Sequence, residues 1–189
     1  MQNDSAERRI ALAASNEAKL EGLMDAYGDQ VKYLIYSYVK DWGITSDLVQ
    51  EVFVSVYMKL DGFEGRSTYK TWIYSIAINR AKDYLKSWHF RHMAVAEKVA
   101  SFIKDSSRTP EDLAIENDTH RELLKTVWAL PIKYREVILL HYYQELSVSE
   151  ISEALGFPLK TIKTRLFRAK EKIRKTYIPV ERGRHYESI

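Results

Sequence analysis

The chain of 189 residues contains no cysteine, which excludes disulfide bonds, thiol catalysis, thiol redox sensing and zinc fingers. It contains only seven glycines and four prolines, and this scarcity favours a helix-rich protein with few turns. No apolar run reaches the roughly 18 residues that suggest a membrane span. The N-terminus lacks the apolar core of a signal peptide, so we expect a cytoplasmic protein.

Phosphate-binding loops are also missing, since neither G-x-x-x-x-G-K nor G-x-G-x-x-G occurs, and this argues against a nucleotide-binding enzyme. His89 and His92 could share a helical turn, but no third ligand lies nearby at metal-binding spacing. Glu116 and His120 do not match the E-x-x-H spacing of di-iron bundles. We therefore predict no catalytic residue, no metal and no cofactor.

Apolar residues recur with helical spacing along most of the chain, and continuous strand-like alternation is absent. The sequence predicts an all-α protein with two small helical domains joined by a flexible linker. We expect domains at 1–92 and 111–178, a linker at 93–110 and a loose tail at 179–189. The predicted helices span about 18–41, 45–60, 68–88, 111–129, 132–143, 148–155 and 158–177, with a short one near 95–103.

The segment from Leu146 to Arg168 is typical of a helix-turn-helix. Ser147 and Glu150 have the spacing of a capping box at the start of its first helix. Gly156 suits the end of that helix, and Pro158 suits the first turn of the next. On a helical wheel the second helix has one apolar stripe, formed by Leu159, Ile162, Leu166, Ala169 and Ile173.

The opposite face of this second helix carries Lys, Thr and Arg, which major-groove recognition uses for base edges and phosphates. Residues 156–185 contain ten Lys or Arg against two Glu, in a chain whose net charge is only +3. The alternative is a solvated basic face on an ordinary helical hairpin. The predicted duplex contacts are Pro158, Lys160, Thr161, Lys163, Thr164, Arg165 and Arg168.

The predicted helix at 68–88 lies in a second basic stretch, since residues 66–91 contain six basic side chains and one acidic one. Cationic, amide and aromatic groups together bind single-stranded DNA, and the glycine-containing loop at 61–67 could hold a base turned out of the duplex. Tyr69 and Trp72 fall on the apolar face and are predicted as core residues rather than stacking platforms. The predicted strand contacts are Phe63, Arg66, Ser67, Thr68, Thr71, Ser75, Asn79, Lys82 and Lys86.

Asp47 and Glu51 form an acidic pair at i, i+4 spacing on the predicted helix at 45–60, for which Thr45 or Ser46 is the expected N-cap. No histidine lies at ligand spacing, so a metal or acid–base site is disfavoured. Like charges on one helical face destabilise it slightly, and this favours an external basic partner over a purely solvated face.

Three stretches, in this order, resemble motifs of the extracytoplasmic-function (ECF) group of bacterial sigma factors. Residues 47–53, DLVQEVF, resemble its polymerase-binding helix, and residues 69–79, YKTWIYSIAIN, resemble its promoter-melting helix. Residues 130–137, LPIKYREV, resemble the start of its second DNA-binding domain. Three positions depart from the family pattern: Tyr69 replaces Phe, Ile73 replaces Leu, and Lys160 stands where Gly is common.

The resemblance implies an alternative sigma factor, responsive to stress or envelope signals, that directs RNA polymerase to specific promoters. The first domain would melt and hold the minus-ten element, and the second would bind the minus-thirty-five element as duplex. Expected partners are the clamp and flap of core RNA polymerase, promoter DNA and an anti-sigma factor, soluble or membrane-anchored. The resemblance implies clamp docking through Asp47, Leu48, Gln50, Glu51 and Phe53.

Two other functions stay open from the sequence. A helix-turn-helix regulator that is not a polymerase subunit would explain the C-terminal half alone, and would also be expected to carry a ligand-binding or dimerising domain. A helical-bundle enzyme would need a constellation of histidines and carboxylates that the sequence does not offer. Only the sigma-factor hypothesis predicts a stable stoichiometric complex with core RNA polymerase.

Overall fold

The computed structural model describes residues 2–93 and 118–176, and every regular element within these two ranges is a helix. The predicted all-α class is therefore confirmed. Most of the predicted linker at 93–110, the short helix near 95–103 and the tail at 179–189 lie outside the described residues. The first part of the predicted helix at 111–129 also lies outside them.

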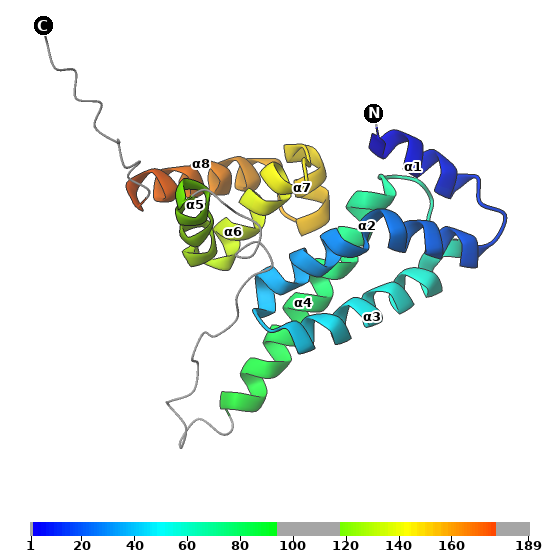
Figure 1. The fold of residues 1–189 in the computed structure, drawn as a ribbon, viewed down its shortest axis with the longest axis horizontal. Coiled ribbons are helices and arrows are strands. Elements are labelled where there is room, and N and C mark those ends of the chain that lie inside the picture. The colour runs from blue at the N-terminus through cyan, green and yellow to red at the C-terminus, as the bar shows by residue number, and fades with distance from the viewer. Residues whose placement is uncertain (1, 94–117, 177–189) are drawn as a thin grey trace, which may run out of the picture.

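The N-terminal half consists of four helices, with α2, α3 and α4 packed against one another and α1 lying on α2 (Figure 1). A short 3-10 turn, η1 (Leu60–Gly62), follows α3. The sequence did not predict α1. The helices are α1 (Gln2–Ala11), α2 (Asn16–Val39), α3 (Trp42–Lys59) and α4 (Tyr69–Met93).

The junction between α2 and α3 is set by local backbone chemistry. Lys40 adopts a left-handed conformation with φ 56°, and its N–H donates to the Tyr36 carbonyl to end α2. Asp41 then caps α3, because its side chain accepts the N–H of Ile44 at 2.9 Å. The predicted cap at Thr45 or Ser46 is therefore wrong: Thr45 is buried inside the first turn, and its hydroxyl donates to the Asp41 carbonyl.

The C-terminal half consists of α5 (Asp118–Ala129), α6 (Ile132–Ile138), a π-helical turn η3 (Leu139–Tyr143), α7 (Val148–Leu155) and α8 (Leu159–Thr176). The predicted capping box is confirmed, since Ser147 and Glu150 bond each other's backbone N–H. Gly156 ends α7 with φ 67°, as predicted. Leu159, predicted in the apolar stripe of α8, is instead exposed.

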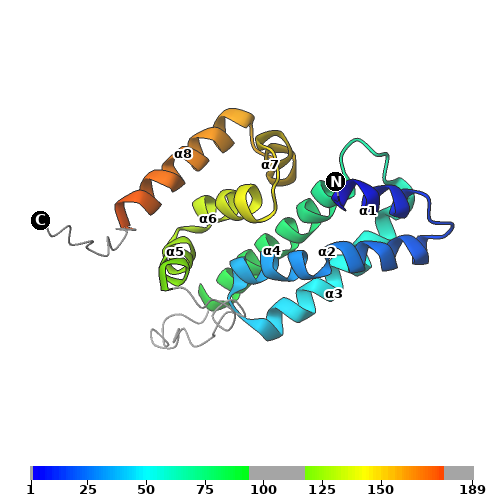
Figure 2. The same cartoon turned by 45° about the horizontal axis from the view of Figure 1, so that its top comes forward.

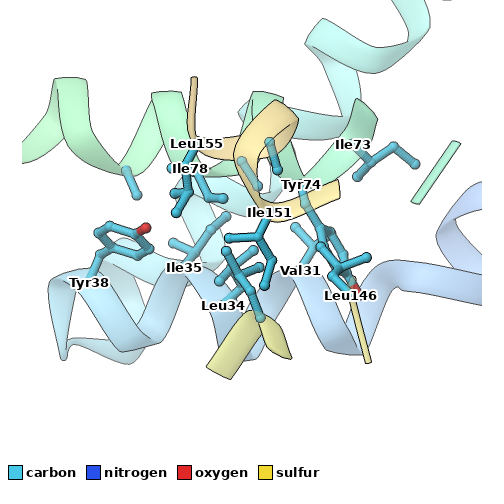
Figure 3. Close-up of a cluster of buried hydrophobic side chains, with 14 of the residues drawn as sticks. Val31, Leu34, Ile35, Tyr38, Ile73, Tyr74, Ile78, Leu146, Ile151 and Leu155 are labelled. Carbon is cyan, nitrogen blue, oxygen red and sulfur yellow. The ribbon is translucent and has the colours of Figure 1, made fainter. Parts of the chain in front are cut away.

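The two halves share one hydrophobic core rather than standing apart. Helix α7 packs along α4, and the two helices lie side by side in both views (Figures 1 and 2). The close-up in Figure 3 shows apolar side chains of the C-terminal half facing α2 and α4. The labelled residues of this shared core are Val31, Leu34, Ile35, Tyr38, Ile73, Tyr74, Ile78, Leu146, Ile151 and Leu155.

Candidate nucleic-acid interface

The polar face of α8 lines an open groove of about 530 Å³ beside the start of α6. Six of the seven predicted duplex contacts line this groove, which we call the reading groove after that prediction. Lys163 is exposed on the same helix without lining it. Sequence analysis missed two lining residues because they belong to α6, which only the fold brings next to α8. The lining residues are Lys133, Tyr134, Pro158, Lys160, Thr161, Thr164, Arg165 and Arg168.

Arg165 differs from the other cations of the reading groove because its side chain is already engaged. Its Nη1 donates to Oε1 of Glu136 at 2.8 Å, and its guanidinium carbon lies 4.0 Å from the centre of the Phe157 ring. Removing Arg165 from this pair would be costly, because the carboxylate of Glu136 is buried and would lose one of its two cationic partners. In this conformation Arg165 therefore fixes α8 to α6.

The loop before α4 is held by stacked aromatic rings. The Phe63 ring lies 4.3 Å from the Tyr69 ring and 4.8 Å from the Trp72 ring, measured between centroids. Tyr69 is buried and Trp72 half-buried, so the prediction that both belong to the core side of α4 is confirmed. The loop turns at Gly65, whose φ of 67° is a left-handed backbone conformation that residues with a side chain rarely adopt.

The predicted polar stripe of α4 is only partly accessible. Asn79 and Lys86 are exposed, and Lys86 pairs with Asp83 on its own helix. Ser75 is half-buried and donates to the Trp72 carbonyl. Thr71 is 1% exposed, so the prediction that it lies on the solvent face is wrong. Its hydroxyl accepts the hydroxyl of Thr68 and its N–H donates to Thr68 Oγ1, which makes it part of the helix start.

Lys82, the remaining member of the stripe, binds a buried carboxylate of the other half. Glu136 is 2% exposed, and it accepts the Tyr38 hydroxyl at 2.7 Å and Lys82 Nζ at 3.2 Å on one oxygen. Arg165 binds the second oxygen at 2.8 Å. We call these four residues the Glu136 cluster. Burial, and then the charge of Glu136, raises the pKa of Tyr38 well above its ordinary value.

A second polar contact between the halves is centred on Gln144. The Tyr74 hydroxyl donates to its side-chain oxygen at 2.5 Å, and Lys70 Nζ donates to its backbone carbonyl. Burial raises the pKa of Tyr74 and lowers the pKa of Lys70. Sequence analysis missed Tyr74, Gln144 and Glu136, because no local pattern distinguishes them from surface polar residues.

The acidic pair lies on an exposed face of α3, on the side of the N-terminal bundle away from the C-terminal half (Figures 1 and 2). Leu48 and Phe53, which the resemblance implied as polymerase contacts, are buried in the core and hold α3 in place instead. Two exposed apolar residues that sequence analysis missed share the acidic face: Val54 is 64% exposed and Met58 is 75% exposed. We call Asp47, Gln50, Glu51, Val54 and Met58 the docking face.

The docking face combines charge with apolar surface. Glu51 forms an ion pair with Arg80 of α4, which orients its carboxylate at the rim. Exposed apolar side chains beside charged ones are common where a protein partner binds. Among the described residues, no three His, Asp or Glu side chains group in a way that could hold a metal ion. None of the described helices has both the length and the apolar character to cross a membrane.

An exposed acidic and apolar face on α3, a basic helix α4 and a helix-turn-helix with an open groove are together typical of a DNA-binding protein of transcription. Comparison with family models refines this class. The model for Sigma-70 region 2 matches residues 23–89, and the model for Sigma-70, region 4 matches residues 120–173. Each matched range covers one half of the fold described above.

Similar whole proteins agree with these matches. The chain is 32% identical to the ECF RNA polymerase sigma factor SigW of Bacillus subtilis (strain 168), over 81% of this chain and 86% of that protein. It is 35% identical to the ECF RNA polymerase sigma-E factor of Escherichia coli (strain K12), over 80% of this chain and 82% of that protein. The chain therefore belongs to the ECF RNA polymerase sigma factors, as its motifs predicted.

Two solved structures share the fold. One is the sigma factor RpoE in complex with the anti-sigma factor NepR from Bartonella quintana, with 22% identity, a TM-score of 0.68 and coverage of 82% of this chain and 94% of that chain. The other is CnrH in complex with the cytosolic domain of CnrY, with 20% identity, a TM-score of 0.61 and coverage of 92% and 94%. The arrangement of helices is thus a known sigma-factor fold.

Proposed function

We propose that this sigma factor binds core RNA polymerase through the docking face of α3 and binds promoter DNA through two separate surfaces. The reading groove of α8 takes the minus-thirty-five element as duplex. The loop at 61–68 and the exposed side of α4 take the minus-ten strand. The observation that carries the proposal is the placement of the docking face: an exposed acidic and apolar surface, opposite the C-terminal half, that no DNA-binding role explains.

The chain itself does no covalent chemistry in this proposal, and polymerase supplies the catalytic metal. Strand opening is driven by capture of unstacked bases, each stacking contact contributing about 1–3 kcal/mol. Base capture requires groups that are preorganised, and the stacked Phe63, Tyr69 and Trp72 rings supply a fixed wall beside the loop. A protein that binds core RNA polymerase and opens promoters acts on chromosomal DNA in the cytoplasm.

The proposal further requires the two halves to separate. Two promoter elements centred about 25 base pairs apart are separated by roughly 85 Å, because duplex DNA rises 3.4 Å per base pair. Lys82 on the minus-ten side and Arg165 on the minus-thirty-five side bind the same carboxylate, at 3.2 and 2.8 Å. One chain cannot keep the Glu136 cluster and occupy both elements. The conformation described here is therefore a closed one that opens on polymerase and promoter.

An anti-sigma factor is the expected second partner. The two solved structures described above are complexes, one with the anti-sigma factor NepR and one with the cytosolic domain of CnrY. By analogy, this chain would be held inactive by such a protein and released by a stress or envelope signal. The competing function, a helix-turn-helix regulator that is not a polymerase subunit, leaves Val54 and Met58 of the docking face without a role.

Mixing the purified chain with core RNA polymerase from the host bacterium tests the proposal. We expect an equimolar complex on gel filtration and, with host genomic DNA as template, transcripts that start at a limited set of discrete positions. Core polymerase alone is the control for unspecific starts. The regulator hypothesis predicts DNA binding without an equimolar complex and without new start sites.

A further inference from the structure

Helix α4 begins at the loop that is proposed to receive the minus-ten strand, and its first N–H groups need acceptors. The N–H groups of the N-cap residue and of the first three helical residues, here Tyr69, Lys70 and Thr71, have no partner within the helix itself. Thr68 satisfies one of them, because its Oγ1 accepts the N–H of Thr71 at 3.1 Å. The N–H groups of Tyr69 and Lys70 remain, and no residue of the loop accepts them.

Both remaining N–H groups donate to Glu7, a residue of α1. The N–H of Tyr69 donates to Oε2 at 3.1 Å, and the N–H of Lys70 donates to Oε1 at 3.1 Å. A carboxylate at this end of a helix is also favoured by the helix dipole, whose positive end lies there. Glu7 thus caps α4 across more than 60 residues of sequence, in addition to the local cap at Thr68.

The carboxylate is itself held in place from α1 and α2. The hydroxyl of Tyr27, buried in α2, donates to Oε1 of Glu7 at 2.8 Å. Ile10 is buried between the two helices and lies so close to Gly22 that a Cβ there would be 3.1 Å from Ile10 Cγ1. Helix α1 is therefore docked tightly enough to present Glu7 in one position.

The start of α2, which follows α1 in the chain, holds the other end of the loop, at Asp61. Asp61 accepts the side-chain amide of Asn16, the first residue of α2, at 2.7 Å. Between these two anchors the loop carries one aromatic ring, Phe63, which stacks on Tyr69. Tyr69 is the residue whose backbone Glu7 binds. The path of the loop thus depends on Glu7 through Tyr69.

We propose that Glu7 is a positioning residue for the capture of the minus-ten strand. Its carboxylate fixes the first turn of α4, and through Tyr69 and Phe63 it fixes the loop at 61–68 in the shape that receives an unstacked base. Glu7 makes no contact with DNA in this proposal. The inference rests on the proposed function and assigns to α1 a part in promoter opening.

The test compares Glu7→Ala and Glu7→Gln with two matched controls. Glu21→Ala removes an exposed carboxylate from neighbouring α2, and Val52→Ala should lower the melting temperature through a cavity at a buried residue of α3 that is not part of the loop. Each protein is titrated with a single-stranded oligonucleotide and with a minus-thirty-five duplex, both taken from a promoter identified by the genomic transcripts. Hydrogen exchange is measured at the amides of Tyr69 and Lys70.

We expect Glu7→Ala to bind the single strand between about three- and thirty-fold more weakly, the range that loss of a helix cap corresponds to. Duplex affinity should stay within about twofold of the unmutated protein. Glu7→Gln keeps one acceptor oxygen, so its affinity for the single strand should lie between those of Glu7→Ala and the unmutated protein. Faster exchange should be confined to the start of α4, and both controls should retain strand affinity.

Unchanged strand binding by Glu7→Ala would overturn the inference. So would a loss no greater than that of Val52→Ala at the same fall in melting temperature, because the effect would then be general destabilisation. If the unmutated protein bound no strand even with core polymerase added to open it, the proposed function would fail. The role of Glu7 as a cap would then be decided by exchange at Tyr69 and Lys70 alone.

Discussion

The Tyr38 hydroxyl is the best point at which to perturb the closed conformation. It bonds Glu136 across the two halves at 2.7 Å and belongs to neither the docking face nor the reading groove. A hydrogen bond to a charged group contributes about 1.5–3 kcal/mol. Glu136 keeps Lys82 and Arg165 after the change Tyr38→Phe, so the lower end of this range applies. A free-energy difference of about 1.4 kcal/mol changes an equilibrium constant tenfold, so the ratio of open to closed protein should rise about tenfold.

The absence of cysteine makes this ratio measurable. Ser46→Cys on α3 and Lys175→Cys on α8 place two exposed labelling sites, one on each half, in a chain that has no other thiol. Distance distributions between two spin labels then report the open and closed populations. Tyr84→Phe is the control, because it removes a hydroxyl of α4 for which the described residues provide no hydrogen-bond partner.

Opening should also change strand binding selectively. Apparent affinity scales with the fraction of protein in the competent state. Opening separates Lys82 from Glu136, so the larger open population of Tyr38→Phe should strengthen binding to the minus-ten single strand by up to about tenfold, while binding to the minus-thirty-five duplex should not change. An unaltered distance distribution together with unaltered strand binding would refute the role given to the Glu136 cluster.

Three further predictions follow from the other surfaces. Arg168→Ala in the reading groove should weaken promoter duplex binding by about 1–3 kcal/mol if it contacts a base, with relaxed specificity at one position, as gel-shift titrations would show. Reversing charge at Asp47 and Glu51 together should abolish co-purification with core polymerase while leaving the melting temperature nearly unchanged. Burial raises the pKa of Tyr74, so its contribution to stability is fully present below pH 10.0 and is lost as the pH rises through the folded-state pKa. The urea concentration at the midpoint of unfolding should therefore fall as the pH rises above 10.0, and it should fall less steeply in Tyr74→Phe.

Local chemistry explains which parts of the fold were predictable. The capping box of Ser147 and Glu150, the left-handed Gly156 and the helical period of α8 each depend on residues within one or two turns, and each is confirmed. The start of α3 was not decided locally, because Asp41, Thr45 and Ser46 are all good caps. The fold selects the first of them through the extended backbone of Asp41, with φ −137°.

Non-local contacts explain what the sequence could not show. Tyr38 and Glu136 are 98 residues apart, and nothing in either neighbourhood indicates that they meet. Helix α1 escaped prediction because its place depends on Ile10 and Glu7, which find partners only in α2 and α4. Family motifs have a different limit. The motif that contains Leu48 marks a functional helix but does not separate its core residues from its contact residues.

The distance between labels at positions 46 and 175, followed as partners are added, tests the central claim most directly. The free protein should give the short distance of the closed conformation. On addition of core polymerase and promoter DNA, the account predicts a shift to a much longer distance, consistent with elements separated by roughly 85 Å. A transcriptionally active complex that kept the short distance would contradict it.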